Sequence, residues 1–245
     1  YLHWCQDQFF SLTAAESLNT RIVIHLHDFF HVDGFYHYPP NLLNARFKVL
    51  LNAISGYFKS RRRKIFSDLQ KQNRLRLIAP TSFAKDHVLN SYPFIQPEII
   101  KIIPSPLPSL SLSPEEILCL NDVPETFTQH RTLRLAFCAF NAFTDPRKNF
   151  SLIESCIPHL SRNLGPLSLN VYTNSSERSF FIEHVNINVI NAPTDPHQKL
   201  LFFATNDLFL FPSSMETFGQ VVAEFNSVAV PAVVLSACAA SEIIN

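Results

Sequence analysis

Short apolar runs alternate with amphipathic stretches along most of the chain, and this alternation constrains the fold more than any other feature. Runs such as Arg21–Leu26 and Leu133–Ala139 have the length and composition of buried strands. The stretches between such runs have the spacing of apolar residues that is typical of helices. Strands that alternate with helices predict βαβ units and a parallel sheet. We therefore expect an α/β protein.

The same pattern predicts individual elements in both halves of the chain. In the first half we expect strands at Arg21–Leu26, Leu75–Ala79 and Ile99–Ile103, and helices at Arg61–Asn73 and Ser82–Ser91. In the second half we expect strands at Leu133–Ala139, Leu167–Tyr172, Asn186–Ile190, Asp207–Phe211 and Pro231–Leu235. Helices of the second half are expected at Asn149–Leu160, His197–Thr205 and Thr217–Val228.

A proline-rich stretch separates the two halves. Pro104–Arg131 holds five prolines and several serines without a sustained period. Because proline cannot donate a backbone hydrogen bond, this stretch is predicted to be a connector. We expect a first lobe over residues 1–106, a linker over 107–131 and a second lobe over 132–245. Ligands of such folds bind in a cleft outside the carboxyl ends of parallel strands.

Composition excludes several classes of protein. Twenty Lys and Arg balance twenty Asp and Glu, which argues against nucleic acid or an anionic membrane as the main partner, because both select for a basic surplus. Hydrophobic residues make up 47% and charged residues 16% of the 245 residues, so a disordered chain is excluded. No apolar run reaches the roughly 18 residues of a spanning helix. The five cysteines have no CxxC spacing, which favours a reducing compartment over a disulfide framework or a zinc site.

The segment Phe211–Val230, FPSSMETFGQVVAEFNSVAV, is the most informative one. A strand is predicted to end at Phe211, and Thr217-Phe218-Gly219 is predicted to open a helix. Free amides at the start of a helix can hold a phosphate or the hydroxyls of a sugar. Glu216 and Glu224 could then hold hydroxyls at two points of an extended ligand. An equally good interpretation makes Glu216 a favourable N-terminal charge and Glu224 part of a solvated face.

A second segment, Asn141–Phe150, reads NAFTDPRKNF and follows a predicted strand. Arg147 and Lys148 would lie near the carboxyl end of that strand. Arginine binds a diphosphate through its planar fork, and lysine binds it as a point charge. The simpler interpretation, favoured when this segment is considered by itself, is an ordinary solvated basic pair.

The third segment, His25–Tyr38, holds four histidines and two aspartates in HLHDFFHVDGFYHY. Histidine and aspartate are common metal ligands, but no recognised ligand spacing appears, so we expect no metal site. His27 could donate a hydrogen bond to a phosphate or a hydroxyl, with Asp28 setting its tautomer. The alternative is a capping Asp28 beside a packed His27.

One charge run and several missing motifs complete the survey. Arg61-Arg62-Arg63-Lys64 is interpreted first as a solvated helix face, and contact with lipid phosphates is the weaker alternative. No G-x-G-x-x-G, P-loop or G-x-S-x-G motif occurs. Dinucleotide-dependent enzymes, P-loop ATPases and hydrolases with a nucleophile elbow are therefore without support.

Taken together and in this order, the segments resemble a family-4 glycosyltransferase of the colanic-acid type. HLHDFFHVDGFYHY is similar to HD-x-W-x-x-x-G-x-x-H-Y, and IAPTSFAKDHVLNSYPF with IIPSPL is similar to P-S-x-W and V-I-P-N-G. FNAFTDPRKNF resembles the phosphate loop D-P-R-K-G-F. FPSSMETFGQVVAEFNSVAVPAVV resembles P-S-x-x-E-x-F-G-x-x-x-x-E-A-x-A-x-G-x-P-V-V. The resemblance implies the GT-B fold, with two Rossmann-like lobes, parallel sheets and an interlobe cleft.

For the donor site, the resemblance implies a role for each matching residue. Arg147 and Lys148 would neutralise the donor diphosphate, and Glu224 would hold the ribose hydroxyls. The donor sugar would be held by Glu216, Thr217 and the amides of Phe218 and Gly219. His27 and Asp28 would face the reacting carbon and the acceptor from the first lobe, so that His27, Asp28 and Glu216 form the implied catalytic set.

The resemblance also implies a reaction and a setting. The reaction is retaining transfer of a sugar from a UDP- or GDP-linked donor to a glycan or lipid-linked acceptor, without a metal or cofactor. We expect a cytoplasmic protein, at the inner membrane face if it makes peripheral membrane contact, that acts in polysaccharide or glycolipid assembly.

The chain departs from the family in length and in its glycines. Both lobes are expected to be incomplete, since members of the family are longer. Asn149 stands where D-P-R-K-G has glycine, and CAASE at Cys238–Glu242 stands where members have G-G-x-P-E. The chain has only four glycines. Two alternatives are therefore kept: a non-catalytic sugar- or nucleotide-binding protein that partners an active transferase, and a related nucleotide-sugar epimerase.

Overall fold

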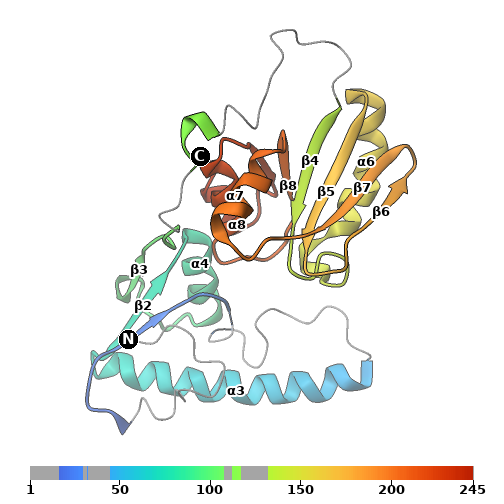
Figure 1. Cartoon of the computed structure of the whole chain (residues 1–245). Helices are drawn as coiled ribbons and strands as arrows, with labels where there is room; N and C mark the ends of the chain where they lie inside the picture. The colour runs from blue at the N-terminus through green and yellow to red at the C-terminus, as the bar shows by residue number, and fades with distance from the viewer. Residues whose placement is uncertain (1–16, 30–31, 33–44, 108–111, 117–131, 245) are drawn as a thin grey trace. The chain divides into compact units, whose positions relative to one another are not determined.

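The chain folds into two compact α/β units (Figure 1). A computed structural model describes residues 17–29, 32, 45–107, 112–116 and 132–244. By its contacts the first unit comprises Tyr1–Ser105 with Glu216–Phe218, and the second comprises Pro106–Met215 with Gly219–Asn245. Each unit has its own sheet, as expected for an α/β protein.

The first unit is built on a small parallel sheet with the strand order β1-β2-β3. The strands are β1 (Ile22–His25), β2 (Leu75–Ala79) and β3 (Ile100–Ile102), and the helices are α3 (Ala45–Lys71), α4 (Ser82–Ser91) and the 3₁₀ turn η1 (Pro97–Ile99). Thr81 caps α4, because its hydroxyl accepts a hydrogen bond from the Ala84 amide at 3.1 Å. The three predicted strands and the predicted helix at Ser82–Ser91 are confirmed.

The second unit holds six strands in the order β6-β7-β5-β4-β8-β9. They are β4 (Leu133–Cys138), β5 (Leu167–Thr173), β6 (Arg178–Ile182), β7 (Val185–Asn191), β8 (Leu208–Phe211) and β9 (Ala232–Val234). The helical elements are η2 (Pro146–Lys148), α6 (Phe150–Leu164), α7 (Pro196–Ala204), α8 (Gln220–Ser227) and η3 (Ala239–Glu242). All neighbouring strands are parallel except β6 and β7, which are antiparallel.

The order of the strands reverses at β4. The chain leaves β4 to form β5 on one side and later returns to form β8 on the other side. Such a reversal is a topological switch point, and the loops after the two strands diverge there to leave room for a ligand. The loop after β4 contains Arg147 and Lys148, and the loop after β8 contains Glu216.

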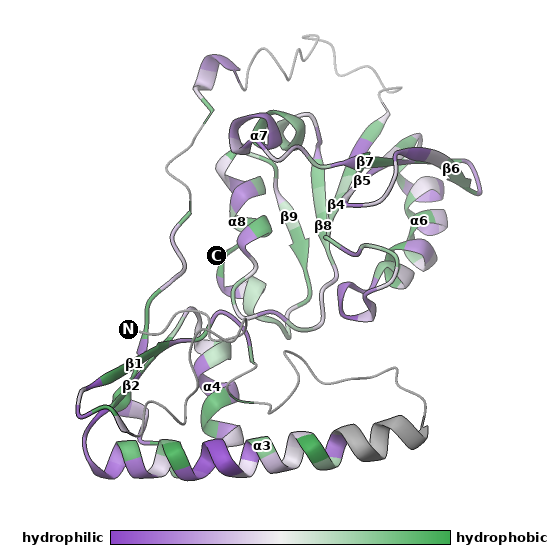
Figure 2. Ribbon diagram, turned by 60° about the horizontal axis from the view of Figure 1, so that its bottom comes forward, coloured by the Kyte–Doolittle hydropathy of each residue, from purple (hydrophilic) through white to green (hydrophobic). Residues whose placement is uncertain are grey.

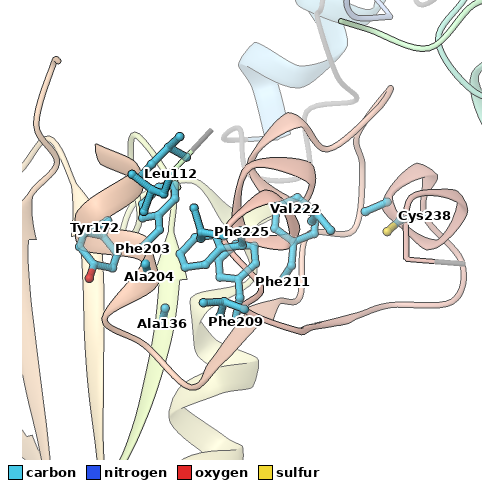
Figure 3. Close-up of a cluster of buried hydrophobic side chains, with 14 residues drawn as sticks. Leu112, Ala136, Tyr172, Phe203, Ala204, Phe209, Phe211, Val222, Phe225 and Cys238 are labelled. Carbon is cyan, nitrogen blue, oxygen red and sulfur yellow. The ribbon is translucent and has the colours of Figure 1, made fainter. Parts of the chain in front are cut away.

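Each face of this sheet has its own core. On one face Leu135, Leu169 and Ile187 pack beneath α6. On the other face Phe225 of α8 stacks between Phe203 of α7 and Phe209 of β8, as Figure 3 shows. The ring centroids are 4.0 Å apart for Phe203 and Phe225 and 3.9 Å apart for Phe209 and Phe225. Stacked aromatic rings of this size bury much apolar area, so the stack fixes both helices on the sheet.

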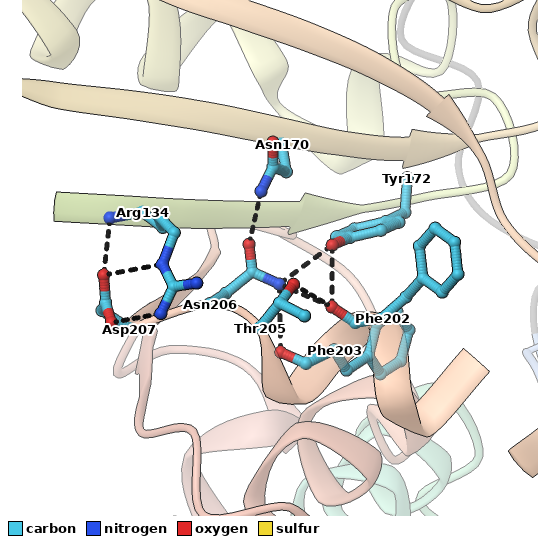
Figure 4. Close-up of polar contacts among 8 residues, drawn as sticks. All are labelled: Arg134, Asn170, Tyr172, Phe202, Phe203, Thr205, Asn206 and Asp207. Atoms are coloured by element: carbon cyan, nitrogen blue, oxygen red, sulfur yellow. Dashed lines mark hydrogen bonds and ion pairs between the residues drawn. The ribbon is translucent and has the colours of Figure 1, made fainter. Parts of the chain in front are cut away.

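A polar network occupies the start of β8 (Figure 4). The Asn206 side chain is 3% exposed and donates to the Tyr172 hydroxyl at 2.9 Å and to the backbone oxygens of Phe202 and Phe203. Arg134 on β4 forms an ion pair with Asp207 at 3.3 Å, and its backbone amide also donates to the Asp207 carboxylate. These contacts fix the N-terminal ends of β4 and β8 against each other.

Two predicted helix starts differ from the structure by three residues or more, and one strand was not predicted. Helix α3 begins at Ala45 and not at Arg61, because the residues before the charge run are themselves compatible with a helix. Strand β6 was not predicted, since it is a short edge strand whose side chains are mostly exposed. Helix α8 begins at Gln220 and not at Thr217, because Gly219 adopts a left-handed conformation with φ 96°.

Among the described helices, none combines the length and the apolar character that a membrane-crossing helix needs. The part of the predicted linker at residues 117–131 and the histidine-rich residues 33–38 lie outside the described residues.

The turn between α8 and β9 contains a strained residue. Ala229 is exposed and has φ 61°, in the left-handed region that costs a residue with a Cβ roughly 1–2 kcal/mol. Replacing Ala229 by glycine should therefore raise the free energy of unfolding by about 0.5–1 kcal/mol, after the larger entropy loss of glycine is subtracted. Chemical denaturation monitored by circular dichroism measures the change.

The same substitution at an exposed helical position is the matched control. Ala53→Gly in α3 should lower the free energy of unfolding by about 1 kcal/mol, because glycine disfavours helix. If both variants were destabilised equally, the strain at Ala229 would be refuted.

Candidate functional site

The loops after β4 and β8 are joined at the switch point by hydrogen bonds. The backbone oxygen of Arg147 accepts from the Ser214 amide at 2.9 Å and from the Ser213 and Ser214 hydroxyls at 3.3 Å each. Ser213 is 1% exposed, so its bond to Arg147 is protected from water. The two loops that carry the predicted donor residues therefore form one surface at the carboxyl ends of β4 and β8.

The basic pair lies in the 3₁₀ turn η2. Asp145 caps this turn, because its carboxylate accepts from the Arg147 amide at 3.0 Å. The same carboxylate binds the Arg147 guanidinium, with Nε 2.9 Å from Oδ1 and Nη2 on Oδ2. This fork-to-fork contact fixes the arginine side chain. Both residues are half-buried, and Arg147 is paired with Asp145.

Glu224 is a buried carboxylate on α8. Its side chain is 7% exposed, and Oε1 accepts from Lys199 Nζ of α7 at 2.7 Å. Its second oxygen, Oε2, is buried and accepts no hydrogen bond from the described residues. A buried carboxylate oxygen without a donor costs free energy that a ligand hydroxyl can recover. The interpretation of Glu224 as part of a solvated face is therefore wrong.

Cys138 is the last residue of β4, and the pKa of its thiol depends on the charged side chains around the switch point. Burial and, to a smaller extent, the nearby Glu224 carboxylate raise the pKa of its thiol to about 12. Lys199 and Lys148 act in the opposite direction. The electrostatic influence of these three residues on one thiol places them around the carboxyl end of β4.

Gly219 stands at the start of α8 in a conformation that favours glycine. It is the N-cap of α8 with φ 96°, and a Cβ built on it would lie 3.0 Å from the Cβ of Ala240. Glycine at this position therefore lets η3 pack closely against the start of α8. This packing is sufficient to explain why the residue is glycine. The predicted helix opening at Thr217 and Phe218 is wrong, because both residues precede α8.

The first unit contains the remaining predicted residues. His27 and Asp28 follow β1, where His27 is exposed and Asp28 is half-buried. The packed histidine of this segment is His25, at 6% exposure, so the interpretation of His27 as a packed residue is wrong. The backbone oxygen of His27 accepts from the Thr217 hydroxyl at 2.7 Å.

Thr217 connects its segment to α4 as well. Its backbone oxygen accepts from the hydroxyl of Thr81, the α4 cap, at 2.8 Å. Both threonines are buried, at 5% and 2% exposure. In agreement with these hydrogen bonds, Thr217 and its neighbours Glu216 and Phe218 group with the first unit when the chain is divided by its contacts. The Glu216 side chain is half-buried.

Within the described residues, no group of three His, Cys, Asp or Glu side chains could hold a metal ion. His31, Asp33 and His37 of the histidine-rich segment lie outside those residues.

Sequence reasoning did not find Lys199, Asp145 or Ser213 as parts of this site. Lys199 lies on a predicted helix with nothing in its neighbourhood to mark it, and its partner Glu224 is 25 positions away. Asp145 is adjacent to the basic pair in D-P-R-K, and an Asp before a Pro-containing turn is a signal for a cap. Only the Asp145 contact could have been predicted from local sequence.

Comparisons with known proteins agree on the fold. The sequence matches no protein-family model, and no curated protein is significantly similar to it. Among solved structures, HepE of Anabaena in complex with UDP aligns with 96% of this chain at 15% identity and a TM-score of 0.58. Sucrose-phosphate synthase of Thermosynechococcus elongatus aligns with 91% at 12% identity and a TM-score of 0.56.

A third structure is WaaG, a glycosyltransferase involved in lipopolysaccharide biosynthesis. It aligns with 91% of this chain at 15% identity and a TM-score of 0.55. The chain spans 58% of the length of HepE, 60% of WaaG and 52% of the sucrose-phosphate synthase. With its two α/β units and a switch-point site, this chain therefore belongs to the GT-B fold class. Its particular structural neighbours are glycosyltransferases of that class, so the predicted GT-B fold is confirmed.

The environment of Cys138 makes a chemical prediction. Because its thiol pKa is raised to about 12, Cys138 should remain a protonated, unreactive thiol in the folded protein near pH 8. Exposed Cys156 should alkylate with iodoacetamide at an ordinary rate. Peptide mass mapping after timed alkylation measures both. Equal rates for the two cysteines in the native protein would contradict the buried placement, and equal rates in denaturant serve as the control.

Proposed function

We propose that this protein is a retaining glycosyltransferase that moves a sugar from a nucleotide-sugar donor to a glycan or lipid-linked acceptor. One observation carries the proposal: the loops after β4 and β8 are hydrogen-bonded to each other at the switch point, and Lys148 of the first loop and the buried Glu224, which has an unsatisfied oxygen, both act on the Cys138 thiol at the end of β4. A nucleoside diphosphate needs cations for its phosphates and an acceptor for its ribose hydroxyls. This site offers both.

In this proposal each donor residue has one task. Arg147 and Lys148 neutralise the diphosphate, and the Asp145 contact orients the arginine for it. Oε2 of Glu224 accepts a hydrogen bond from a ribose hydroxyl, while Oε1 remains bonded to Lys199 Nζ. HepE has been solved with UDP and with UDP-glucose, which supports a uridine nucleotide as the first donor to test.

The proposed reaction is a substitution at the anomeric carbon. The acceptor hydroxyl oxygen forms a bond to that carbon, and the bond from the carbon to the diphosphate oxygen breaks with its electron pair moving to the diphosphate. The hydroxyl proton passes to the leaving diphosphate. We propose that Glu216, Thr217 and the amides of Phe218 and Gly219 hold the sugar, and that His27 and Asp28 face the reacting carbon. Catalysis then consists of positioning and charge stabilisation, without a metal or cofactor.

The proposal also includes the family and the setting. Membership of family 4 is supported by the matched D-P-R-K and E-x-F-G segments. The acceptor would be a growing polysaccharide or a glycolipid at the cytoplasmic side of a membrane. WaaG, which acts in lipopolysaccharide biosynthesis, supports this class of acceptor.

Lys148→Ala tests the diphosphate site. Titration calorimetry of the chain with UDP and GDP should show saturable binding of one nucleotide, weakened about tenfold or more in the variant, because a charge-assisted contact to phosphate contributes roughly 1.5–3 kcal/mol. Lys101→Ala, an exposed lysine on β3, is the matched control and should bind as the wild type does. Binding that is equal in both variants would remove Lys148 from the site.

Glu224→Gln tests the ribose contact. The wild type should prefer UDP to 2′-deoxy-UDP, and the variant should lose about tenfold in UDP affinity and bind both ligands alike, because a neutral amide accepts a weaker hydrogen bond. Glu154→Gln, on the exposed face of α6, is the control. A variant that still discriminates between the two ligands would exclude Glu224 as the ribose ligand.

Turnover separates the proposal from its alternatives. With labelled UDP-sugars and membrane glycolipid, release of UDP together with labelled lipid supports transfer. Nucleotide binding without turnover favours the non-catalytic partner, and conversion of the free donor sugar without an acceptor favours the epimerase. Glu216→Ala should abolish transfer while leaving UDP binding within about twofold.

A further inference from the structure

Asparagine recurs in β5 and β7 at positions where a strand rarely carries it. Asn170 lies on β5, and Asn186 and Asn188 lie on β7. Asparagine is depleted in strands, because its side chain competes for local hydrogen bonds and packs poorly on a pleated surface. Leu169 and Ile187, which lie between these positions, belong to the core beneath α6. Since successive side chains of a strand point to opposite faces, the asparagines share the other face of the sheet.

The register of the three outer strands places these asparagines in two rows. Figure 2 shows β6 at the outer edge of the sheet, beyond β7 and β5. Each row crosses β5, β7 and β6 in that order, and the rows are Ser168, Asn186 and Phe181, and Asn170, Asn188 and Ser179. We call these six residues the amide face. Paired side chains on one face are near enough to contact a single ligand together.

The amides of this face form a chain of hydrogen bonds. Nδ2 of Asn186 donates to Oδ1 of Asn188 at 2.9 Å, and Nδ2 of Asn188 donates to Oδ1 of Asn170 at 3.1 Å. Asn170 in turn donates to Asn206 at 2.8 Å, as Figure 4 shows. Each amide therefore donates to the next one, and the oxygen at the head of the chain is left over. This oxygen, Oδ1 of Asn186, is buried and accepts no hydrogen bond from the described residues.

An exposed aromatic ring lies beside that oxygen. Phe181 is paired with Asn186 across β6 and β7 and is 69% exposed. Exposed side chains change rotamer readily, so the ring does not hold the asparagine closed to a ligand. Ser179, also on β6, is exposed and donates to Oδ1 of Asn188 at 3.2 Å. The amide face therefore offers a ring next to amide and hydroxyl groups.

The charges around this face disfavour an anionic ligand. None of its six residues is charged. The guanidinium of Arg178 on β6 lies 5.2 Å from the ring centroid of Phe143 and 5.8 Å from that of Phe180, whose side chain packs against the core beneath α6. Arg178 is thus on the opposite face. Glu177 and Glu183, which flank β6, are exposed acids. A phosphate polymer needs cations, and it would be repelled here.

We propose that the amide face binds a neutral carbohydrate chain, with one sugar ring against Phe181 and sugar hydroxyls on the amides of Asn186 and Asn188. A hydroxyl both donates and accepts hydrogen bonds, as does a side-chain amide, so the two kinds of group match. The face of an aromatic ring carries partial negative charge and attracts the C–H groups of a sugar ring. A sugar hydroxyl supplies the donor that Oδ1 of Asn186 lacks.

This site is separate from the one at the switch point. Ser168, Asn170, Asn186 and Asn188 lie within the first four residues of β5 or β7. The candidate donor residues instead follow the carboxyl ends of β4 and β8. The proposal therefore does not rest on sugar transfer from a nucleotide, and it requires no nucleotide to be bound.

Affinity electrophoresis tests the proposal with the whole 245-residue chain. Native gels that contain soluble starch, laminarin or galactomannan provide three neutral polysaccharides, and at least one of them should retard the chain. Phe181→Ala should raise the dissociation constant about tenfold, because an aromatic ring that is covered by a ligand loses that burial. No retardation by any of the three, or equal retardation of the variant, would overturn the proposal.

Asn186→Leu separates ligand binding from a purely structural role. It should weaken polysaccharide binding about tenfold, since the amide is lost. The unfolding temperature should not fall, because the substitution also removes a buried oxygen without a donor and places an apolar residue in the strand. A lower unfolding temperature with unchanged retardation would show that the amides serve only the sheet, and it would refute the site.

The matched control removes an exposed aromatic ring elsewhere. Tyr57 on α3 is 60% exposed, and Tyr57→Ala should be retarded as the wild type is. Retardation that falls equally in Tyr57→Ala and Phe181→Ala would contradict a site on the amide face. UDP affinity, measured by calorimetry, should be the same in all these variants. A wild-type chain that fails to bind UDP but is retarded by polysaccharide would count against the donor site and support this one.

Discussion

The parallel pairing of β4 with both β5 and β8 is the constraint on which the second unit depends. Leu135 and Ala136 pair with Leu208 and Phe209 on one side, while the full length of β4 pairs with β5 on the other. The ion pair of Arg134 with Asp207 fixes the start of β4 and β8, and the hydrogen bond of Ser214 to Arg147 joins their loops at the other end. Because both ends are fixed, the two loops at the switch point cannot move apart without breaking these contacts.

Burial then gives the switch point its chemical character. Glu224 would be costly as an isolated buried charge, and Lys199 offsets that cost through a 2.7 Å contact. The stack of Phe203, Phe225 and Phe209 holds α7 and α8 so that this pair can form. One carboxylate oxygen is left over, and the raised pKa of Cys138 reflects the low polarity around it. A polar ligand placed in such surroundings interacts more strongly than it would in water.

The scarcity of glycine leaves a structural mark on the chain. Asn73, Asn149, Glu183 and Ala229 all have positive φ, a conformation that glycine adopts without strain. Asparagine tolerates it best among the other residues, which explains how Asn149 can stand between η2 and α6. Ala229 has no such compensation. Left-handed positions that are not glycine therefore carry local strain in this chain, as at Ala229.

The sequence alone determined the α/β class and most strand positions, and it singled out Arg147, Lys148 and Glu224 as candidate site residues. These follow from local signals: apolar runs of strand length and charged residues directly after them. Tertiary structure alone decided the antiparallel edge strand β6, the partnership of Lys199 with Glu224, and the packing of Gly219 on Ala240. Each of these contacts involves residues that are distant in sequence or that have no recognisable sequence pattern. Local propensity specifies elements, but the burial of a charge or a glycine depends on neighbours that only the folded chain brings together.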